Sequence, residues 1–136
     1  MARLAARAVI VIAALGAGVV APSIAQAAPM CTTSFIPASG SWATASNWTS
    51  GIVPSSSDVA CVPSGAVVTT TGTAQAGVVW APDAKIVVAA GSLTVSDTVT
   101  ASQLRDLVMS GGQLNGSATV NVSGSFDWSN GSMAGS

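Results

Sequence analysis

The chain has no histidine, glutamate or tyrosine, and charged side chains make up only 7% of its 136 residues. Acid-base and nucleophilic catalysis depend mainly on residue types that are missing or scarce here. Serine is plentiful, but no base stands near it in the sequence, and Lys85 is the single lysine. We therefore predict no catalytic residue, no cofactor and no metal site, and expect a protein that is not an enzyme.

Long apolar runs are also absent, with one exception at the N-terminus. Arg3 and Arg7 precede an uncharged stretch from residue 8 to residue 20, which ends before an Ala25-Gln26-Ala27 sequence. A basic start, an apolar middle and a small-residue cleavage site are typical of a secretory signal peptide. We predict a signal peptide over 1–27 and a secreted or cell-surface protein. The alternative, a membrane anchor, is disfavoured because the run is too short for a bilayer core of about 30 Å.

Basic residues are rare in the chain after this leader. Residues 28–136 carry Lys85 and Arg105 against five aspartates, which gives a net charge of −3. Nucleic acids and anionic membranes attract clusters of lysine and arginine. We therefore expect neither as a partner, and no membrane span in the mature chain.

The chain has only two cysteines, Cys31 and Cys61, and both follow the predicted leader. In an exported protein, such a pair forms a disulfide more often than it stays free. The alternative is a reactive thiol or a metal ligand, but neither cysteine has a second ligand or a base nearby in the sequence. We predict one disulfide.

A motif of about 20 residues is repeated in the second half of the chain. Gly72, Gly91, Gly112 and Gly131 follow one another at intervals of 19, 21 and 19 residues, with alternating apolar positions around each. This period is typical of a solenoid. We predict an all-β, right-handed parallel β-helix over 64–136, with about 3.5 rungs and a glycine bend in each. Its predicted inward columns are Val67, Ile86, Leu107 and Phe126; Thr69, Val88, Met109 and Trp128; Ala74, Leu93, Leu114 and Met133; and Trp80, Val99 and Val120.

The same alignment makes two local predictions. Lys85 and Asp106 should point outward on neighbouring rungs, one directly over the other, as a solvated ion pair. The wider interval across the third rung predicts a bulging corner or a single helical turn over 101–107.

The segment 28–63 is dense in turn-forming residues and is expected to cap the first rung, since a stack of rungs exposes an apolar end. We assign Trp42, Trp48, Ile52 and Val53 to the packing of this cap, with Asp58 accepting hydrogen bonds from turn amides. The competing interpretation is that the two tryptophans form a platform on which sugars stack.

This opening also carries a resemblance to a known group. The chain is similar to the start of secreted right-handed parallel β-helix proteins of the bacterial adhesin and autotransporter-passenger kind, through Trp42, Asn47-Trp48, Gly51, Pro54, Asp58, Pro63 and Gly65 and the Val/Thr/Gly-rich repeats that follow. The resemblance implies the fold and an extracellular setting. It implies no single activity, because adhesins, polysaccharide lyases and stalks share this architecture.

The last predicted rung is incomplete, because no residue follows Met133 to fill the fourth column. Either the natural chain continues, which we favour, or the final rung associates with another molecule, including a second copy. We predict a non-catalytic adhesin-like β-solenoid that contacts glycans or other cell-surface components and forms the N-terminal part of a longer protein. The alternative is the N-terminal fragment of a β-helix polysaccharide-degrading enzyme or of a carbohydrate-binding protein.

Overall fold

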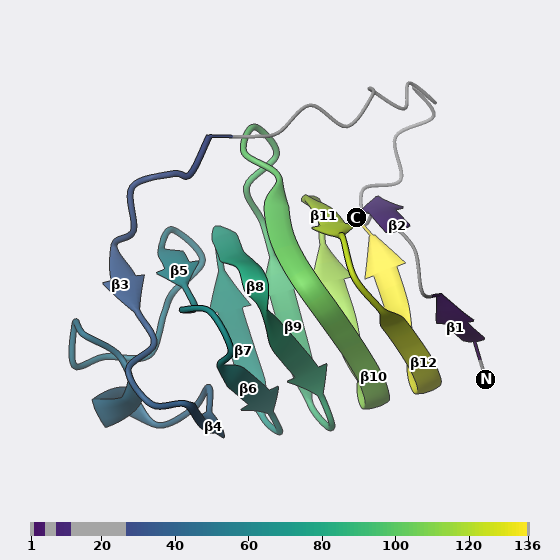
Figure 1. Ribbon diagram of the computed structural model, residues 1–136, viewed down its shortest axis with the longest axis horizontal. Helices are drawn as coiled ribbons and strands as arrows, with labels where there is room; N and C mark the ends of the chain where they lie inside the picture. Colours follow the sequence, from purple (N-terminus) through teal and green to yellow (C-terminus); the bar gives the residue numbers. More distant parts are fainter. Residues whose placement is uncertain (1, 5–7, 12–26, 136) are drawn as a thin grey trace.

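The computed structural model describes residues 2–4, 8–11 and 27–135 (Figure 1). It is almost entirely β-structure, apart from one short 3-10 helix over Ala45–Asn47. The strands are β1 (Ala2–Leu4), β2 (Ala8–Val11), β3 (Thr33–Ser34), β4 (Ser39–Ser41), β5 (Val59–Cys61), β6 (Val67–Thr70), β7 (Thr73–Ala76), β8 (Val78–Val88), β9 (Ser92–Val95), β10 (Ser102–Gly116), β11 (Thr119–Val122) and β12 (Phe126–Gly135).

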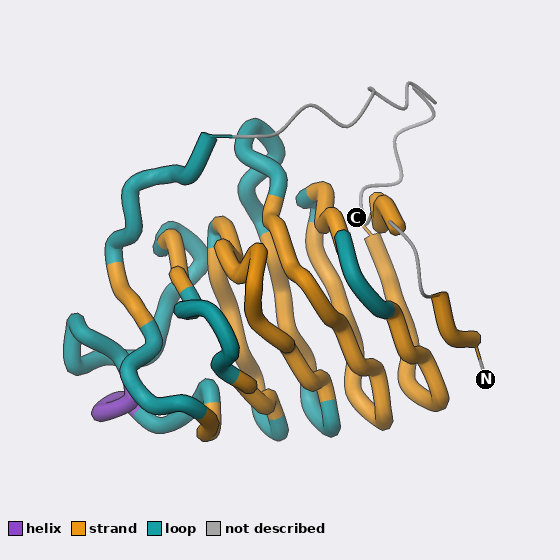
Figure 2. The backbone as a smooth tube through the Cα atoms, in the orientation of Figure 1, coloured by secondary structure: helices purple, strands orange, loops and turns teal. Residues whose placement is uncertain are grey.

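From β3 onward the strands form three ladders, and every pairing within them is parallel. Face A contains β3, β5, the start of β8, the start of β10, and β11. Face B contains β4, β6 and the segments 85–88, 106–109 and 126–128. Face C contains β7, β9 and the segments 113–116 and 132–135. From β5 onward the chain visits the faces in the order A, B, C, so it forms a β-solenoid of about four turns (Figures 1 and 2). This confirms the predicted fold class.

Alternate residues along each strand point into the solenoid, which is the ordinary consequence of a strand period of two. In β6, β9 and β11 the side chains alternate between half-buried and buried. On face B, Ile86, Leu107 and Phe126 are stacked in register and buried. Val88 and Met109 form the next inward column, which continues to Trp128, and Leu93, Leu114 and Met133 form the column on face C. Trp128 and Met133, in the last rung, are only partly buried.

The predicted first members of two columns are wrong by one residue. Ile86 pairs with Val68, and Val88 pairs with Thr70, so Val68 and Thr70 are buried while Val67 and Thr69 face outward. The corner between faces B and C explains the error. It contains two residues, 71 and 72, in this rung but three, 89–91, in the next. Counting back from the glycines therefore shifts the predicted register of the strand by one residue, which exchanges its inward and outward faces.

The predicted fourth column is wrong for Trp80 and Val99, whereas Val120 is buried as expected. Trp80 pairs with Cys61 and Gln103 in an outward column, and Val99 is 92% exposed in a loop. Two inward columns lie on face A. The first consists of Val79, Ser102 and Val120, and the second, two residues further along each strand, consists of Ala81, Leu104 and Val122. Residues 96–101 form the loop between β9 and β10, so the extra residues of this rung lie before the segment 101–107, which is strand from Ser102.

The predicted bend glycines lie at the corner between faces B and C. The amide of Ser92 donates to the carbonyl of Gly72 (3.0 Å), and the amide of Gln113 donates to that of Gly91 (2.9 Å). Gly91 and Gly131 have positive φ angles of 66° and 94°. A Cβ atom at Gly91 would collide with the Gly72 carbonyl, and one at Gly131 with the Gly112 carbonyl. Gly91 and Gly131 therefore approach the glycine of the preceding rung through backbone atoms.

Two short strands lie at the far end of the stack, beside the last rung (Figure 1). β1 pairs with β12 and β2 pairs with β11, both antiparallel. They belong to the segment predicted as a signal peptide, of which 5–7 and 12–26 lie outside the described residues. The rung of β11 and β12, predicted to have an open end, thus pairs with β1 and β2.

Candidate functional site

The most regular surface is the outside of face C, where uncharged side chains, most of them polar, lie in two outward columns. Two outward columns run along the stack in strict register. They consist of Thr73, Ser92, Gln113 and Ser132 and, two residues further on, Gln75, Thr94, Asn115 and Ala134. All eight side chains are half-buried or exposed, and none is charged. We call this surface the polar face.

The polar face offers hydroxyl and amide groups on a regular grid. Neighbouring strands of a sheet are about 4.8 Å apart, and residues two apart on one strand are about 7 Å apart. Within the grid, the Asn115 side-chain amide donates to the Gln113 side-chain carbonyl at 3.4 Å. Groups that both donate and accept are those that bind the hydroxyl groups of sugars. The sequence analysis did not single out this face, because it did not carry the strand register of face C to the outward positions.

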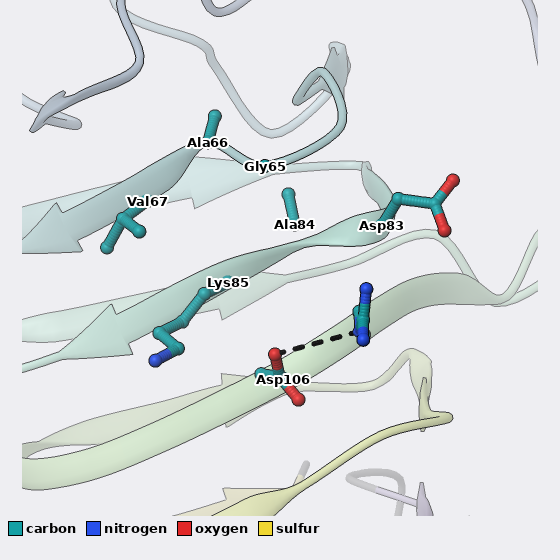
Figure 3. A pocket seen from close by; sticks show the side chains of 8 residues that line it. Gly65, Ala66, Val67, Asp83, Ala84, Lys85 and Asp106 are labelled. Carbon is teal, nitrogen blue, oxygen red and sulfur yellow. Dashed lines mark ion pairs between the residues drawn. The ribbon is translucent and has the colours of Figure 1, made fainter.

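A second surface feature is a shallow hollow on face B, at the corner with face A (Figure 3). Its volume is about 240 Å³, which is below the range of roughly 300–1,000 Å³ common for ligand pockets. Two cations, Lys85 and Arg105, and two carboxylates, Asp83 and Asp106, line it. The other lining residues are Gly65, Ala66, Val67 and Ala84.

Lys85 and Asp106 are partners across neighbouring rungs, as the register prediction required. The ion pair at Asp106, however, is made with Arg105, at 4.0 Å between Nε and Oδ2, and not with Lys85. Figure 3 shows the Lys85 side chain extending away from this contact. The exposed Arg105 side chain makes this a wet ion pair that contributes little to stability.

Asp106 is nevertheless held in its charged form. Partial burial pushes its pKa up, but the amide and hydroxyl of Ser125 both donate to Oδ1, at 2.8 and 2.9 Å, and Arg105 and Lys85 add positive charge nearby. Together these effects lower the pKa of Asp106 below its ordinary value. A carboxylate with a lowered pKa is a poor general acid, because it carries no proton at neutral pH.

An aromatic cluster closes the end of the stack at the first rung, beside β3 and β4. Trp42 and Trp48 are each 1% exposed, and their rings meet edge to face at 4.9 Å. Phe35, which the sequence did not single out, packs on Trp48 at 5.2 Å. The indole nitrogen of Trp48 donates to the Trp42 carbonyl at 2.9 Å. Rings this deeply buried offer no surface for a sugar, so the structure supports the cap over the sugar platform.

Two other residues assigned to the cap behave differently. Val53 is partly buried against the core, whereas Ile52 is 66% exposed. The assignment of Ile52 to cap packing is therefore wrong. The hydroxyl of Ser50 accepts a hydrogen bond from the Ile52 amide and donates to its carbonyl. These contacts hold a tight turn, and the Ile52 side chain points away from the core.

The predicted disulfide joins Cys31 to Cys61, with the Cα atoms 5.7 Å apart. It ties the segment before β3 to β5. Asp58 strengthens the same region: it accepts hydrogen bonds from the amide and hydroxyl of Ser55 and from the hydroxyl of Thr32. The amide of Ser55, the Thr32 hydroxyl and the Ser55 hydroxyl, in that order, lower the pKa of Asp58. The expected role of Asp58 as an acceptor of turn hydrogen bonds is confirmed.

In residues 2–4, 8–11 and 27–135, no group of three or more potential metal ligands comes together. Among the same residues, no helix has the length and apolar character needed to cross a membrane.

Comparisons with known proteins do not extend this description. No protein-family model matches the chain, and searches of curated proteins and of solved structures found no match.

Proposed function

We propose that the chain is an exported, non-catalytic, adhesin-like β-solenoid that presents its polar face to glycans outside the cell. The observation that carries this proposal is the polar face itself, in which uncharged hydroxyl and amide groups repeat in register over four rungs in one column and over three rungs in the next. A rigid grid of such groups suits a repetitive ligand, because each added sugar meets a further rung at no extra ordering cost.

The disulfide supports the exported setting. Disulfides persist in oxidising compartments and are rare in the cytosol. Cys31 lies four residues after the predicted cleavage site, so the bridge anchors the new N-terminus as soon as the leader is removed.

The two different ends of the solenoid support a structural role. One end is closed by buried rings and the disulfide. The other end presents the strand edges of β11 and β12, with which further strands pair. In our proposal the capped end begins a rod, and the strand edge is where the rod is extended or joined to another molecule.

Glycan binding is tested with an array of neutral and acidic oligosaccharides and the fluorescently labelled protein. Asn115→Ala, on the polar face, should reduce binding about 5- to 20-fold, as expected for one or two lost hydrogen bonds. Asn121→Ala removes the same side chain from an outward position on face A and should leave binding unchanged. Equal effects of the two variants would contradict the polar face as the binding surface.

Export is tested by the intact mass of the protein secreted by its own host. A mass equal to that of 28–136, less the two thiol hydrogens, would support leader removal and the disulfide. A much larger mass would identify the chain as the N-terminal part of a longer rod. A protein that retains residues 1–27 would contradict the exported setting.

A second candidate function rests on the hollow on face B. Lys85 and Arg105 lie there beside Asp83 and Asp106, and positive charge in a hollow attracts an acidic ligand such as a polyuronate. An assay for unsaturated sugar products on polyuronates, compared with an Arg105→Ala variant, distinguishes this alternative. No product formation with the unaltered protein would leave the non-catalytic proposal standing.

A further inference from the structure

We propose that Asn130 is a site of spontaneous covalent modification, at which the side-chain amide is lost and the residue becomes aspartate or isoaspartate. The reaction needs only water and the backbone of the corner between faces B and C, so the inference goes beyond the proposed function and does not depend on it. It rests on the difference between two Asn-Gly pairs in the chain, Asn130-Gly131 and Asn115-Gly116.

An asparagine followed by a glycine carries the two groups that this reaction joins. The glycine nitrogen loses its proton and attacks Cγ of the asparagine, which expels ammonia and closes a five-membered succinimide ring. Water then opens the ring, at the side-chain carbonyl to give aspartate or at the main-chain carbonyl to give isoaspartate. The net change consumes one water and releases one ammonium ion. Glycine favours ring closure, because no side chain restricts its backbone.

The reacting groups of Asn130-Gly131 are already in contact. The Gly131 amide donates a hydrogen bond to Oδ1 of Asn130 at 2.8 Å. Because Oδ1 is bonded to Cγ, this contact places the attacking nitrogen beside the carbon that it must reach. Reactions within a molecule are accelerated when the reacting atoms are held close together. Asn130 is also exposed, so water can reach the ring.

Gly131 lies outside the strand ladder that holds its neighbours. In the register between β10 and β12, Ser110 pairs with Asn130 and Gln113 pairs with Ser132. Among the described residues, Gly131 has no partner in this register or in that of β1. Its positive φ angle of 94° belongs to the bend of the corner. The nitrogen can therefore attack without first leaving a ladder.

Asn115-Gly116 is the matched pair in which the fold opposes the same reaction. Gly116 pairs with Val95 on one neighbouring rung and with Gly135 on the other. The side-chain amide of Asn115 donates to the side-chain carbonyl of Gln113 at 3.4 Å. Ring closure at Asn115 would need a local opening of β10 between two rungs, and such an opening costs free energy.

The features of Asn130 belong to the corner and are also found where a rung follows. Ser110, the partner of Asn130 on the preceding rung, lies between the rungs of β8 and β12 and is nevertheless exposed. Gly112, in the same corner as Ser110, likewise has no register partner among the described residues. A covered corner thus keeps an outward side chain and a glycine outside the ladder.

The modification would alter the corner at which the polar face of this rung begins. It places a carboxylate two residues before Ser132, which is a member of the first outward column. Isoaspartate also adds a carbon atom to the main chain beside Gly131, where the backbone approaches the Gly112 carbonyl.

The test follows the folded 136-residue protein during incubation at mildly alkaline pH. Proteolysis after Arg105 releases one peptide, 106–136, that contains both Asn-Gly pairs. Its fragment masses show at which asparagine the amide nitrogen has been replaced by oxygen. We expect Asn130 to react at least about 10-fold faster than Asn115, which must wait for a local opening. Equal rates, or a faster reaction at Asn115, would overturn the proposal.

A control in urea separates the effect of the fold from that of the sequence. In the unfolded chain neither pair is held in a ladder, so Asn115 and Asn130 should react at similar rates. A preference for Asn130 that is equally large in urea would overturn the structural explanation.

A variant and a product analysis test the chemical route. Asn130→Gln keeps a side-chain amide but would have to close a six-membered ring, which forms much more slowly. Modification at position 130 should therefore stop, while that of Asn115 keeps its rate. Isoaspartate among the products of the unaltered protein shows that the ring has formed, because direct hydrolysis gives aspartate alone. Undiminished modification of Asn130→Gln, or a product without isoaspartate, would contradict the proposed reaction.

Discussion

Gly91 lies directly over Gly72 in the stack, and the two residues contact each other through their backbone atoms. The Gly72 carbonyl accepts a hydrogen bond from Ser92 (3.0 Å) and occupies the space that a side chain on Gly91 would need. The contact is one-sided, because a Cβ atom on Gly72 would meet nothing within 4 Å. Two glycines in the same column therefore differ in what they require.

This asymmetry predicts the effect of alanine at the two positions. Gly91→Ala combines a positive φ with a backbone collision and should lower the free energy of unfolding by about 2–4 kcal/mol. Gly72→Ala should change it by less than about 1 kcal/mol. Urea unfolding followed by circular dichroism measures both. Equal losses would mean that the two corners are not stacked as described.

The aromatic cap makes a second matched pair available. Trp48→Ala empties a fully buried site and should cost about 3–5 kcal/mol, whereas Ile52→Ala, at an exposed position, should stay within about 0.5 kcal/mol. Trp48→Phe keeps most of the ring but loses the hydrogen bond to the Trp42 carbonyl, so an intermediate loss is expected. Thermal unfolding of the three variants provides the ranking, and an Ile52→Ala loss as large as that of Trp48→Ala would contradict the cap.

Loss of the disulfide should destabilise the protein by about 3–4 kcal/mol, as the chain-entropy model gives for a loop of this length. The variant is the double substitution Cys31→Ser and Cys61→Ser, compared by urea unfolding with the oxidised protein. A reductant should produce the same loss in the unaltered protein and no change in the double variant. A reductant effect on the double variant would point to a cause other than the bridge.

Stability should fall in acid, in part through Asp58. Hydrogen bonds from Ser55 and Thr32 lower its pKa in the folded protein, so the unfolded chain binds a proton first as the pH falls. The stabilisation by Asp58 is complete above the unfolded pKa of about 3.9 and is lost as the pH falls through the lower folded pKa. Asp58→Asn should therefore destabilise the protein more at pH 7 than at pH 3. A difference that is the same at both pH values would contradict this role.

The register of β6 is tested by placing the same polar residue on its two faces. Val68→Asn buries an amide in the core and should cost about 2–4 kcal/mol. Val67→Asn lies on the outward side and should cost less than about 1 kcal/mol. Urea unfolding of the two variants is the measurement. The reverse order would support the register expected from the glycine spacing and contradict the structure.

The solenoid was predictable because its determinants repeat. The corner glycines and the apolar positions beside them return at nearly constant intervals, and the interval itself defines the stack. The positions of some strand residues were predicted wrongly, because the same interval was applied across corners of unequal length. Because the corner at Thr71 and Gly72 has only two residues, the glycine spacing predicted Val67 at the inward position that Val68 holds. Because 96–101 form a loop, Val99 does not lie in the column of Val120, where the spacing predicted it.

The candidate surfaces were less accessible from the sequence. The polar face depends on which residues share an outward column, and Gln75 and Gln113 come together only through the register of β7, β9 and β10. The ion pair at Asp106 depends on side-chain direction. Arg105 precedes Asp106 in the sequence and Lys85 pairs with it on the neighbouring rung, so the backbone brings both cations near the carboxylate. Phe35 was missed in the cap because a single aromatic residue outside the repeats carries no period.

The loop of 96–101 differs from the other corners between faces C and A, which contain Gly77 alone in one rung and residues 117 and 118 in another. Its turn is closed locally, by the amides of Val99 and Thr100 donating to the Asp97 carboxylate at 2.7 and 2.9 Å. The strands on either side keep their parallel partners. The solenoid thus accommodates several extra residues at this corner, whereas the corner between faces B and C varies only between two residues, 71 and 72, and three, 89–91. A foreign peptide grafted between Thr98 and Val99 would be displayed from the rod without altering a single rung.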